Sequence, residues 1–293
     1  MKFKFTKKSV PQYRRYTRSK AGNFFYFLLL FLAGAFTVLP LIYCIITSFK
    51  PLDELLIFPP QFFVKRPTLV NYLALPSLLS KIQVPLSRYF FNSLFVAIAG
   101  TFLHIIAASL AAFTLSKSKV KGRKALFWLL QIMLLYNAVT LAIPRYYIYT
   151  KLHMIDTYWV YILPAIPGAT GCFLMKQYMD VSVPDALMEA ARIDGASVMR
   201  MYFSVIMPIL KPAWMTMLLL SFQEMWTIIP QGTIFSEQLK TLPQVMNSIS
   251  AGGIARSGSA MAVTVLLMIP PILVFLISQS NVMETMSTSG IKE

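Results

Sequence analysis

Residues 24–48 read FFYFLLLFLAGAFTVLPLIYCIITS, a run of apolar and small residues that contains no charged side chain. An α-helix needs about 20 predominantly apolar residues to cross the hydrocarbon core of a bilayer, so this run is long enough. Pro40 inside it predicts a kink, which neighbouring helices of a bundle can tolerate, and Lys50 and Pro51 mark its end. The stretch therefore predicts a first transmembrane helix.

The composition of the whole chain agrees with this prediction. Of its 293 residues, 57% are hydrophobic and 13% are charged, whereas a soluble domain is about 25% charged. The first 23 residues are basic and polar, the run after them is too long for the apolar core of a secretory signal, and no small-residue cleavage site follows. We therefore expect an integral membrane protein without a cleaved signal.

Further apolar runs of similar length follow the first, at residues 88–115, 125–143, 158–175, 208–229 and 260–278. Together with residues 24–48 they predict an all-α membrane protein with six transmembrane helices. The run 88–115 is rich in Ala, Gly and Ser, which let helices approach closely in a membrane, so we expect this helix at the centre of the bundle. Pro164 and Pro167-Gly168 predict a break in the fourth helix, and Pro270-Pro271 lie inside the sixth.

Positive charge is concentrated in two segments next to apolar runs. Residues 1–20 contain eight Lys or Arg and residues 117–124 contain five, with no acid in either, and the formal net charge of the chain is +16. Such clusters mark cytoplasmic segments of membrane proteins, and no basic-aromatic module accompanies them, which argues against nucleic-acid binding. We expect cytoplasmic segments at 1–23, 116–124, 176–207 and 279–293, with both termini cytoplasmic, and extracytoplasmic loops at 49–87, 144–157 and 230–259.

The polar stretch 189–195, EAARIDG, lies in the cytoplasmic segment 176–207 between two apolar runs. Ser182 and Asp185 have the spacing of a capping box and Pro184 suits a first turn, so we expect a helix that starts at Ser182. It should run through Ala191 or Ile193 and end at Gly195.

Ser197 can cap a second helix that leads to Pro208 and the fifth span. From the residues alone, the helix–turn–helix is either an ordinary amphipathic helix at the membrane interface or a docking element for a partner. The small residues Ala190 and Ala191 beside an acid suit the second alternative.

The spacing around this stretch resembles a known motif. Glu189-Ala190-Ala191 is followed by three residues and Gly195, then by nine residues and the segment Val205-Ile206-Met207-Pro208. Binding-protein-dependent ABC importer permeases carry Glu-Ala-Ala, three residues, Gly, nine residues and Ile-x-Leu-Pro. The spacing agrees in full, with Val in place of Ile and Met in place of Leu.

Other stretches, over residues 24–280, resemble the carbohydrate-uptake branch of that family, to which maltose transporter permeases belong. They are Ser48-Phe49-Lys50-Pro51 with Asp53-Glu54, Thr68-Leu69-Val70-Asn71-Tyr72, Asn92-Ser93-Leu94 with residues 110–116, Asp156-Thr157-Tyr158 with Leu163-Pro164, and residues 190–197. The tail from Val282 to Lys292 resembles the subgroup that takes complex or polyuronate-derived oligosaccharides. The fifth helix departs from the pattern: it reads Gln223-Glu224-Met225-Trp226 up to Pro230, where sugar permeases have Trp and Asn before Pro.

The resemblance implies a type I ABC importer permease fold in a multi-pass protein of the bacterial plasma (inner) membrane. It implies an ATP-driven importer for oligosaccharides in which this chain forms half of the translocation pore. The implied partners are a second homologous permease subunit, an ATPase subunit dimer, an extracytoplasmic solute-binding protein and membrane lipid.

The motif residues would couple the chain to the ATPase. Glu189 would pair with a basic residue of the ATPase, Ala190 and Ala191 would permit close approach, and Gly195 would give the turn. Asp194 and Pro208 complete the set of motif positions expected to couple.

We expect no enzymatic activity in this chain. The phosphate-binding motif G-x-x-x-x-G-K-[ST] is absent, since no glycine precedes a lysine, so ATP and Mg²⁺ are expected on the partner ATPase and no cofactor on this chain. His104 and His153 are far apart, and Cys44 and Cys172 have no metal-ligand spacing, so no catalytic or metal site is predicted. Helix packing is the favoured role for His104.

Glu224 is the one acid inside a predicted span. An ionisable residue at membrane depth is a functional-site hypothesis, so we expect Glu224 along the translocation path, with Gln223, Gln131 and Asn137 as further polar candidates. The alternative is an acid that packs helices. Two alternative functions stay open at this point: an ABC permease for a non-sugar solute, and a self-contained secondary transporter, which needs coupling-ion sites and usually two related halves that the sequence lacks.

Overall fold

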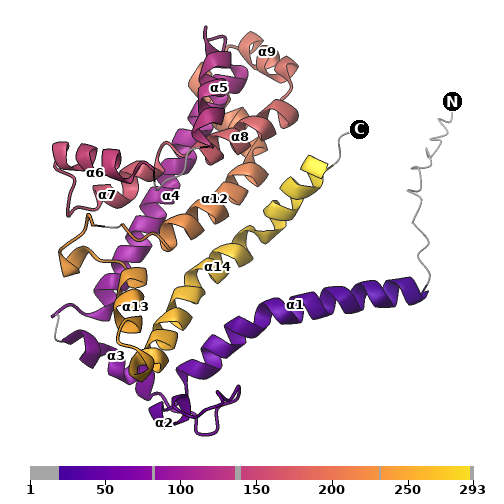
Figure 1. The fold of residues 1–293 in the computed structure, drawn as a ribbon. Coiled ribbons are helices and arrows are strands. Elements are labelled where there is room, and N and C mark those ends of the chain that lie inside the picture. The colour runs from indigo at the N-terminus through magenta and orange to yellow at the C-terminus, as the bar shows by residue number, and fades with distance from the viewer. Residues whose placement is uncertain (1–19, 81–82, 136–139, 231, 291–293) are drawn as a thin grey trace.

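The protein is built around helices that run side by side, as the computed structural model shows for residues 20–80, 83–135, 140–230 and 232–290 (Figure 1). The described residues form helices, turns and loops, with no β-strand among them. The main body consists of α4 (Leu86–Lys117), α8 (Ala169–Ser182), α12 (Lys211–Trp226) and α14 (Ser257–Gly290). α12 packs against both α4 and α14, and α4 also packs along α8. The fold is therefore an all-α membrane bundle, as predicted.

α4 lies at the centre of this bundle because its small residues face its neighbours. Ala97, Ala108 and Ala112 are buried, and Ala97 and Ala112 belong to two different hydrophobic clusters. A Cβ at Gly100 would approach the sulfur of Met225 on α12 to 2.9 Å, so this glycine allows close contact between the two helices. The prediction of a central second span is confirmed.

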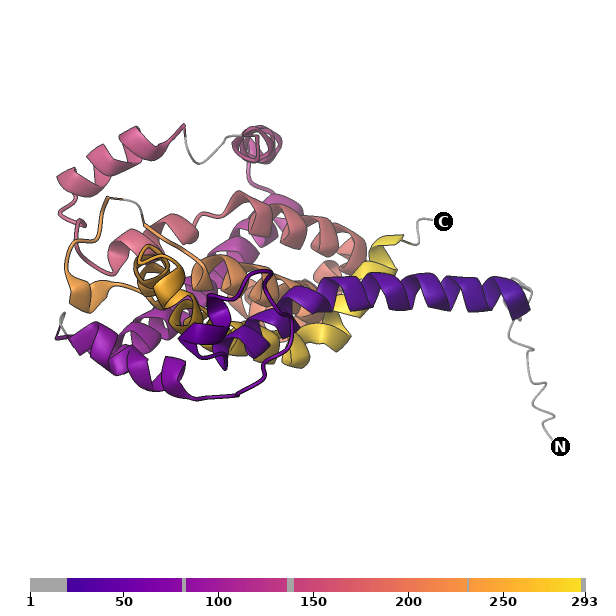
Figure 2. The same ribbon diagram turned by 60° about the horizontal axis from the view of Figure 1, so that its bottom comes forward.

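α1 (Lys20–Ser48) extends away from the bundle (Figures 1 and 2). Only one end of it packs on α14, and most of its apolar side chains are exposed, including Phe31 and Phe36. Apolar side chains in this arrangement suit a hydrocarbon environment, in agreement with the predicted first span. Pro40 lies inside the helix without ending it.

Three helices among the described residues are long and apolar enough to cross a membrane, namely Ala21–Ser48, Leu86–Lys117 and Ile254–Met283. A fourth candidate is a broken one, in which Val198–Ile209 and Lys211–Trp226 meet at an angle of 78°. The predicted fifth span at 208–229 therefore contains a sharp bend at Leu210, and its straight part starts after the bend. The count of six spans and the side of the termini stay predictions.

The predicted third and fourth spans are not continuous helices. In place of one helix over 125–143, α5 (Arg123–Met133) ends early and α6 (Ala142–Lys151) follows, so part of the expected loop 144–157 is helical. The fourth span consists of α7 (Trp159–Ile162), the short 3-10 helix η1 (Leu163–Ala165) and α8. The break at Pro164 and Pro167-Gly168 was expected, but α8 continues to Ser182 rather than to residue 175.

The proline-rich segment 49–87 contains two short helices, α2 (Leu52–Leu55) and α3 (Val70–Ser80). Its motif residues hold the backbone in place. The side-chain amide of Asn71 donates to the carbonyls of Ser48 (2.9 Å) and Lys50 (2.7 Å), which closes the end of α1. The buried carboxylate of Glu54 accepts backbone N–H groups of Lys65 and Arg66 at 3.0 and 2.8 Å. These motif positions are thus structural.

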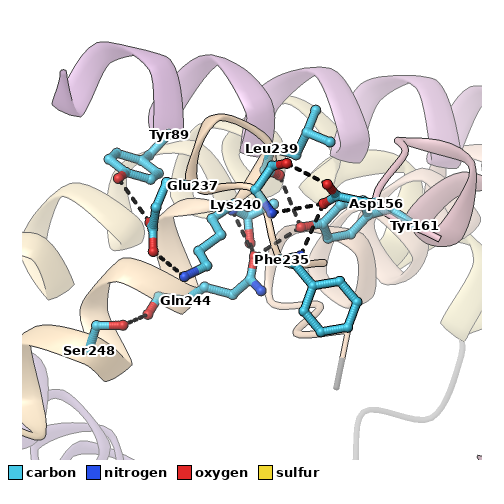
Figure 3. Close-up of polar contacts among 11 residues, drawn as sticks. Tyr89, Asp156, Tyr161, Phe235, Glu237, Leu239, Lys240, Gln244 and Ser248 are labelled. Atoms are coloured by element: carbon cyan, nitrogen blue, oxygen red, sulfur yellow. Dashed lines mark hydrogen bonds and ion pairs between the residues drawn. The ribbon is translucent and has the colours of Figure 1, made fainter. Parts of the chain in front are cut away.

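The segment 230–259 is also folded, with η3 (Glu237–Leu239), α13 (Leu242–Ser250) and η4 (Ile254–Arg256). Figure 3 shows how polar side chains hold η3 and α13 beside α4. Asn92 on α4 donates to the carbonyls of Gln238 (2.7 Å) and Lys240 (2.9 Å), and Tyr89 donates to Glu237 (3.3 Å). The segment is therefore attached to the first half of α4.

Asp156 fixes the start of the same segment (Figure 3). Its carboxylate accepts the backbone N–H groups of Phe235 (3.0 Å) and Ser236 (2.9 Å) and the hydroxyl of Ser236. The hydrogen bond from the Ser236 hydroxyl, followed by those from the backbone, lowers the pKa of Asp156 below its ordinary value of 3.8. Tyr161 adds a hydroxyl 2.9 Å from Gln244 of α13.

Candidate functional site

The polar stretch singled out by the sequence forms α9 (Asp185–Ile193), at the end of the bundle opposite to α13 and α3 (Figure 1). The helix starts later than predicted. Ser182 is the last residue of α8 and caps nothing in α9, whose N-cap position is Pro184 in an extended conformation with no side-chain cap. The expected capping box is wrong because the preceding helix continues through Ser182.

The end of α9 follows the prediction. Gly195 has a φ of +76°, the left-handed conformation that closes a helix. Its N–H donates to the carbonyl of Arg192 (3.0 Å), and the N–H of Ala196 reaches back to Ala191 (3.0 Å). These two bonds make a Schellman motif, which satisfies the last carbonyls of the helix.

A second short helix, α10 (Val198–Met201), follows the Schellman turn, and Ser197 caps it as predicted, through a hydrogen bond of 3.3 Å from the N–H of Arg200. The chain therefore turns sharply between two capped helices, with Gly195 at the corner.

One side chain anchors α9 to the bundle. Met188 is only 4% exposed and belongs to a core cluster with Met179 on α8 and Met201 and Tyr202 after the turn. Ala191 packs against the same cluster as a partly buried residue. The residues on the other side of the helix are exposed, and they are Glu189, Ala190, Arg192, Ile193 and Asp194. The motif residues Glu189 and Ala190 are therefore free to meet another surface.

The outer surface of this region is partly apolar. Ile193 is 86% exposed, and Val198, Met199 and Phe203 are exposed as well. Exposed apolar side chains that gather beside charged residues are typical of a protein interaction site. We refer to these four residues, together with Glu189 and Ala190, as the α9 surface.

The α9 surface connects to α12 through an irregular segment. A π-helix, η2 (Tyr202–Ile206), leads into α11 (Met207–Ile209), which contains Pro208, and the 78° bend follows at the buried Leu210. The hydroxyl of Tyr202 lies 2.6 Å from that of Ser109 on α4. The motif thus begins on an exposed helix and ends at the bend before α12.

A second contact joins α9 to α4 directly. The ammonium of Lys117, at the end of α4, lies 2.8 Å from the carboxylate of Asp185, at the start of α9. This ion pair, through its hydrogen bond and then its charge, lowers the pKa of Asp185 below 3.8. Next to it, Lys176 and Asp180 on α8 form another ion pair of 2.6 Å.

A cavity of about 540 Å³ lies farther along the bundle, between α4, the broken fourth span and α12. Its polar lining residues are His104, Arg145, Thr170, Ser221 and Glu224. A second hollow of about 310 Å³ shares Arg145 and Pro164 with it, so the two adjoin.

The cavity contains one of the four residues predicted along the translocation path. Glu224 lines it, whereas Gln223 and Gln131 lie outside its lining, and Asn137 lies outside the described residues. Arg145 was not predicted, because its surroundings read as a loop; its one signal is a charge directly after an apolar run. His104, for which the sequence favoured helix packing, lines the cavity and is also buried against the backbone of the fourth span.

The described part of the chain contains no group of three or more His, Cys, Asp or Glu side chains placed to hold a metal ion. The candidate site consists of the exposed α9 surface and a polar cavity. It contains no constellation for catalysis among these residues.

Comparison with known proteins places the chain among transport components. A family model described as "Binding-protein-dependent transport system inner membrane component" matches residues 75–287. The chain is 27% identical to the arabinooligosaccharides transport system permease protein AraQ of Bacillus subtilis, over 70% of this chain and 73% of AraQ. It is 31% identical to the sn-glycerol-3-phosphate transport system permease protein UgpE of Pectobacterium atrosepticum, over 67% and 70% of the two chains.

The fold resembles that of a chain in the crystal structure of a bacterial ABC transporter that imports the acidic polysaccharide alginate. The TM-score is 0.72 at 21% identity, and the match covers 90% of this chain and 98% of the other. This similarity supports the fold.

Proposed function

The chain belongs to the family of binding-protein-dependent transport system inner membrane components, and we propose that it forms half of the translocation pore of an ATP-driven oligosaccharide importer. The observation that carries the proposal is the α9 surface. A motif with the family's spacing lies on a helix that is anchored by Met188 on one side and exposed at Glu189 and Ala190 on the other.

In the proposed mechanism, α9 docks on an ATPase subunit, which binds ATP and Mg²⁺. Glu189 pairs with a basic residue of that subunit, Ala190 and Ala191 allow close approach, and Gly195 and Asp194 form the turn beyond the contact. When ATP closes the ATPase dimer, α9 moves with it, and Pro208 and the bend at Leu210 pass the movement to α12. ATP thereby shifts the population of two conformations by its different affinity for each.

The residues of this path are mechanically connected. Met188 and Met201 share one core cluster with Leu210 and Met217, so α9, the π-helix and α12 move against a common packing surface. Packed cores transmit displacement because they are dense and have few voids. The Tyr202–Ser109 hydrogen bond ties the same segment to α4.

The cavity is the proposed translocation path. Glu224 offers carboxylate oxygens and Arg145 offers N–H donors, and sugar hydroxyls can both donate and accept. AraQ, to which the chain is similar, is named for arabinooligosaccharides, which supports an oligosaccharide as the solute. The similarity to UgpE, named for sn-glycerol-3-phosphate, favours a small phosphorylated polyol as the second candidate.

The proposed assembly contains this chain, a second homologous permease subunit, an ATPase dimer and an extracytoplasmic solute-binding protein, in the lipid of a bacterial inner membrane. A self-contained secondary transporter is disfavoured by membership in a binding-protein-dependent family.

Co-purification tests the proposal. The tagged chain, expressed with the other subunits of its importer, is expected to bring down an ATPase, and Glu189→Lys or Gly195→Pro is expected to lose it. Arg256→Glu, an exposed charge reversal in η4 near α13, is the matched control and should retain the ATPase. Full uptake of solute by the Glu189→Lys variant without ATPase would contradict the proposal.

A further inference from the structure

His104 lies against the break in the fourth span. Its Nδ1 atom is 2.8 Å from the carbonyl oxygen of Ala165 and 3.3 Å from that of Ile166. A carbonyl oxygen only accepts hydrogen bonds, so Nδ1 carries the proton and donates it to the break. The imidazole comes from the middle of α4 and is 6% exposed. One buried side chain of the central helix therefore donates to the backbone of the break, where the Ala165 carbonyl also accepts the N–H of Gly168 at 3.2 Å.

Two glycines make room for the ring. A Cβ at Gly168 would overlap Cε1 of His104 and lie 2.8 Å from its Nδ1. A Cβ at Gly171 would overlap Nε2 of the ring and lie 2.7 Å from a methyl group of Met217.

Neither glycine is required by its backbone conformation. Gly168 has a φ of −56°, and Gly171 is a helical residue without a positive φ. A side chain could adopt both conformations. Glycine is therefore needed at positions 168 and 171 because the imidazole of His104 occupies the space that a Cβ would take.

We propose that His104 is a positioning residue, which holds the broken fourth span against α4 and so fixes one wall of the cavity that contains Glu224. His104, Ala165, Gly168 and Gly171 all line that cavity. We call the contact of His104 with Ala165, Ile166, Gly168 and Gly171 the His104 clamp. The inference rests on the proposed function only in taking the cavity as the translocation path, whereas the clamp rests on these contacts alone.

Thiol labelling tests the clamp without any transport measurement. Cys172 follows Gly171 directly, is buried, and is a free thiol, as is Cys44. In a Cys44→Ser background, the tagged full-length chain is labelled with N-ethylmaleimide in native membranes and then isolated. His104→Leu removes the hydrogen bond to the break, so α8 should move away from α4 more often and expose Cys172. Because such a bond is worth about 1 kcal/mol, Cys172 in this variant should be labelled about fivefold faster than in the parent.

The conservative variant separates the hydrogen bond from packing. In His104→Asn, the amide nitrogen can take the place of Nδ1, so labelling of Cys172 should stay within about twofold of the parent. Equal labelling rates in His104→Leu and the parent would overturn the proposal, whatever the transport activity.

A second experiment changes the size of the side chains at positions 168 and 104. Gly168→Ala should accelerate labelling because its Cβ meets the ring. Gly168→Ala combined with His104→Asn should label more slowly than Gly168→Ala alone, since Asn lacks Cε1, the ring atom that the Cβ overlaps most. Gly34→Ala, whose Cβ meets nothing within 4 Å, is the matched control. If Gly168→Ala behaves like Gly34→Ala, the clamp is refuted. Faster labelling with unchanged uptake would keep the clamp and refute the cavity as the path.

Discussion

The ammonium of Lys117 and the carboxylate of Asp185 form an ion pair of 2.8 Å that joins the last residue of α4 to the first residue of α9. The Lys117 side chain is 7% exposed, whereas Asp185 is largely exposed. Because α4 is the central helix of the bundle, this pair gives α9 a direct contact with the centre of the protein. It is independent of the anchor at Met188, which acts in the core.

The ion pair predicts a defect in coupling rather than in folding. Lys117→Gln should leave the chain in the membrane but reduce solute-stimulated ATP hydrolysis by the assembled importer, because α9 loses its ion pair with α4. Lys119→Gln removes a charge from the same basic segment and serves as the control. Exchange of the charges, Lys117→Asp with Asp185→Lys, should recover activity, and an exchange variant as impaired as Lys117→Gln would speak against the pairing.

The pH dependence of the pair has a definite sign. Lys117 lowers the pKa of Asp185 below 3.8 in the folded state. The stabilisation is therefore present above that ordinary value and is lost as the pH falls through the lowered pKa. Between pH 6 and 8 the coupling difference between Lys117→Gln and the parent should stay constant. ATPase assays across this range check it, and a difference that vanishes at pH 6 would show that another group is responsible.

Replacement of Gly195 should weaken the turn after α9 through the backbone conformation alone, without a steric clash. Nothing lies within 4 Å of the position of a Cβ there, but the φ of +76° is unfavourable for other residues. Gly195→Ala should weaken the Schellman turn by about 1 kcal/mol, and Gly195→Asn should be milder, because Asn tolerates this conformation. The yield of co-purified ATPase measures the effect. Gly34→Ala is the control, and equal ATPase yields for Ala and Asn at position 195 would contradict the explanation.

Replacement of Asp156 should destabilise the segment 230–259 rather than the whole protein. Asp156→Asn keeps the size of the side chain but removes the charge that accepts three hydrogen bonds from Phe235 and Ser236. The segment 230–259 should then be cut faster by added protease, with the bundle intact. Since the folded pKa of Asp156 lies below 3.8, the wild-type segment should keep its protection down to about pH 4. Ser248→Ala, on the exposed face of α13, is the control.

The long spans could be predicted from the sequence because each is one apolar run. Residues 24–48, 88–115 and 260–278 all lie within continuous helices, and prolines at 40, 270 and 271 did not end them. The other runs show the limit of this signal. Composition alone does not distinguish one straight span from the two helices α5 and α6, or from a span that bends at Leu210. Neighbouring helices decide whether the backbone polar groups of a broken segment find hydrogen-bond partners.

The two parts of the site differ in the same way. Glu189 to Gly195 could be found because the signal is local: charges, a glycine and fixed spacing within one segment. Glu224 could be found as a charge in an apolar run. The predicted start of α9 at Ser182 is wrong because α8 continues through Ser182 and α9 begins at Asp185. His104 and Arg145 line the same cavity as Glu224 only through the packing of α4, α6 and α12, and no local pattern contains that arrangement.

Glu224 gives the sharpest test of the cavity as the translocation path. Glu224→Gln keeps the shape and the hydrogen-bonding capacity but removes the carboxylate, which accepts more strongly than an amide because charged acceptors form stronger bonds. If solute hydroxyls bind there, uptake by membrane vesicles should fall severalfold, while binding of the ATPase at the distant α9 surface is unchanged. Gln223→Ala alters the neighbouring side chain, which does not line the cavity, and should transport normally. Normal uptake by Glu224→Gln would indicate that the acid packs helices, and uptake lost in both variants would indicate that α12 itself has been disturbed.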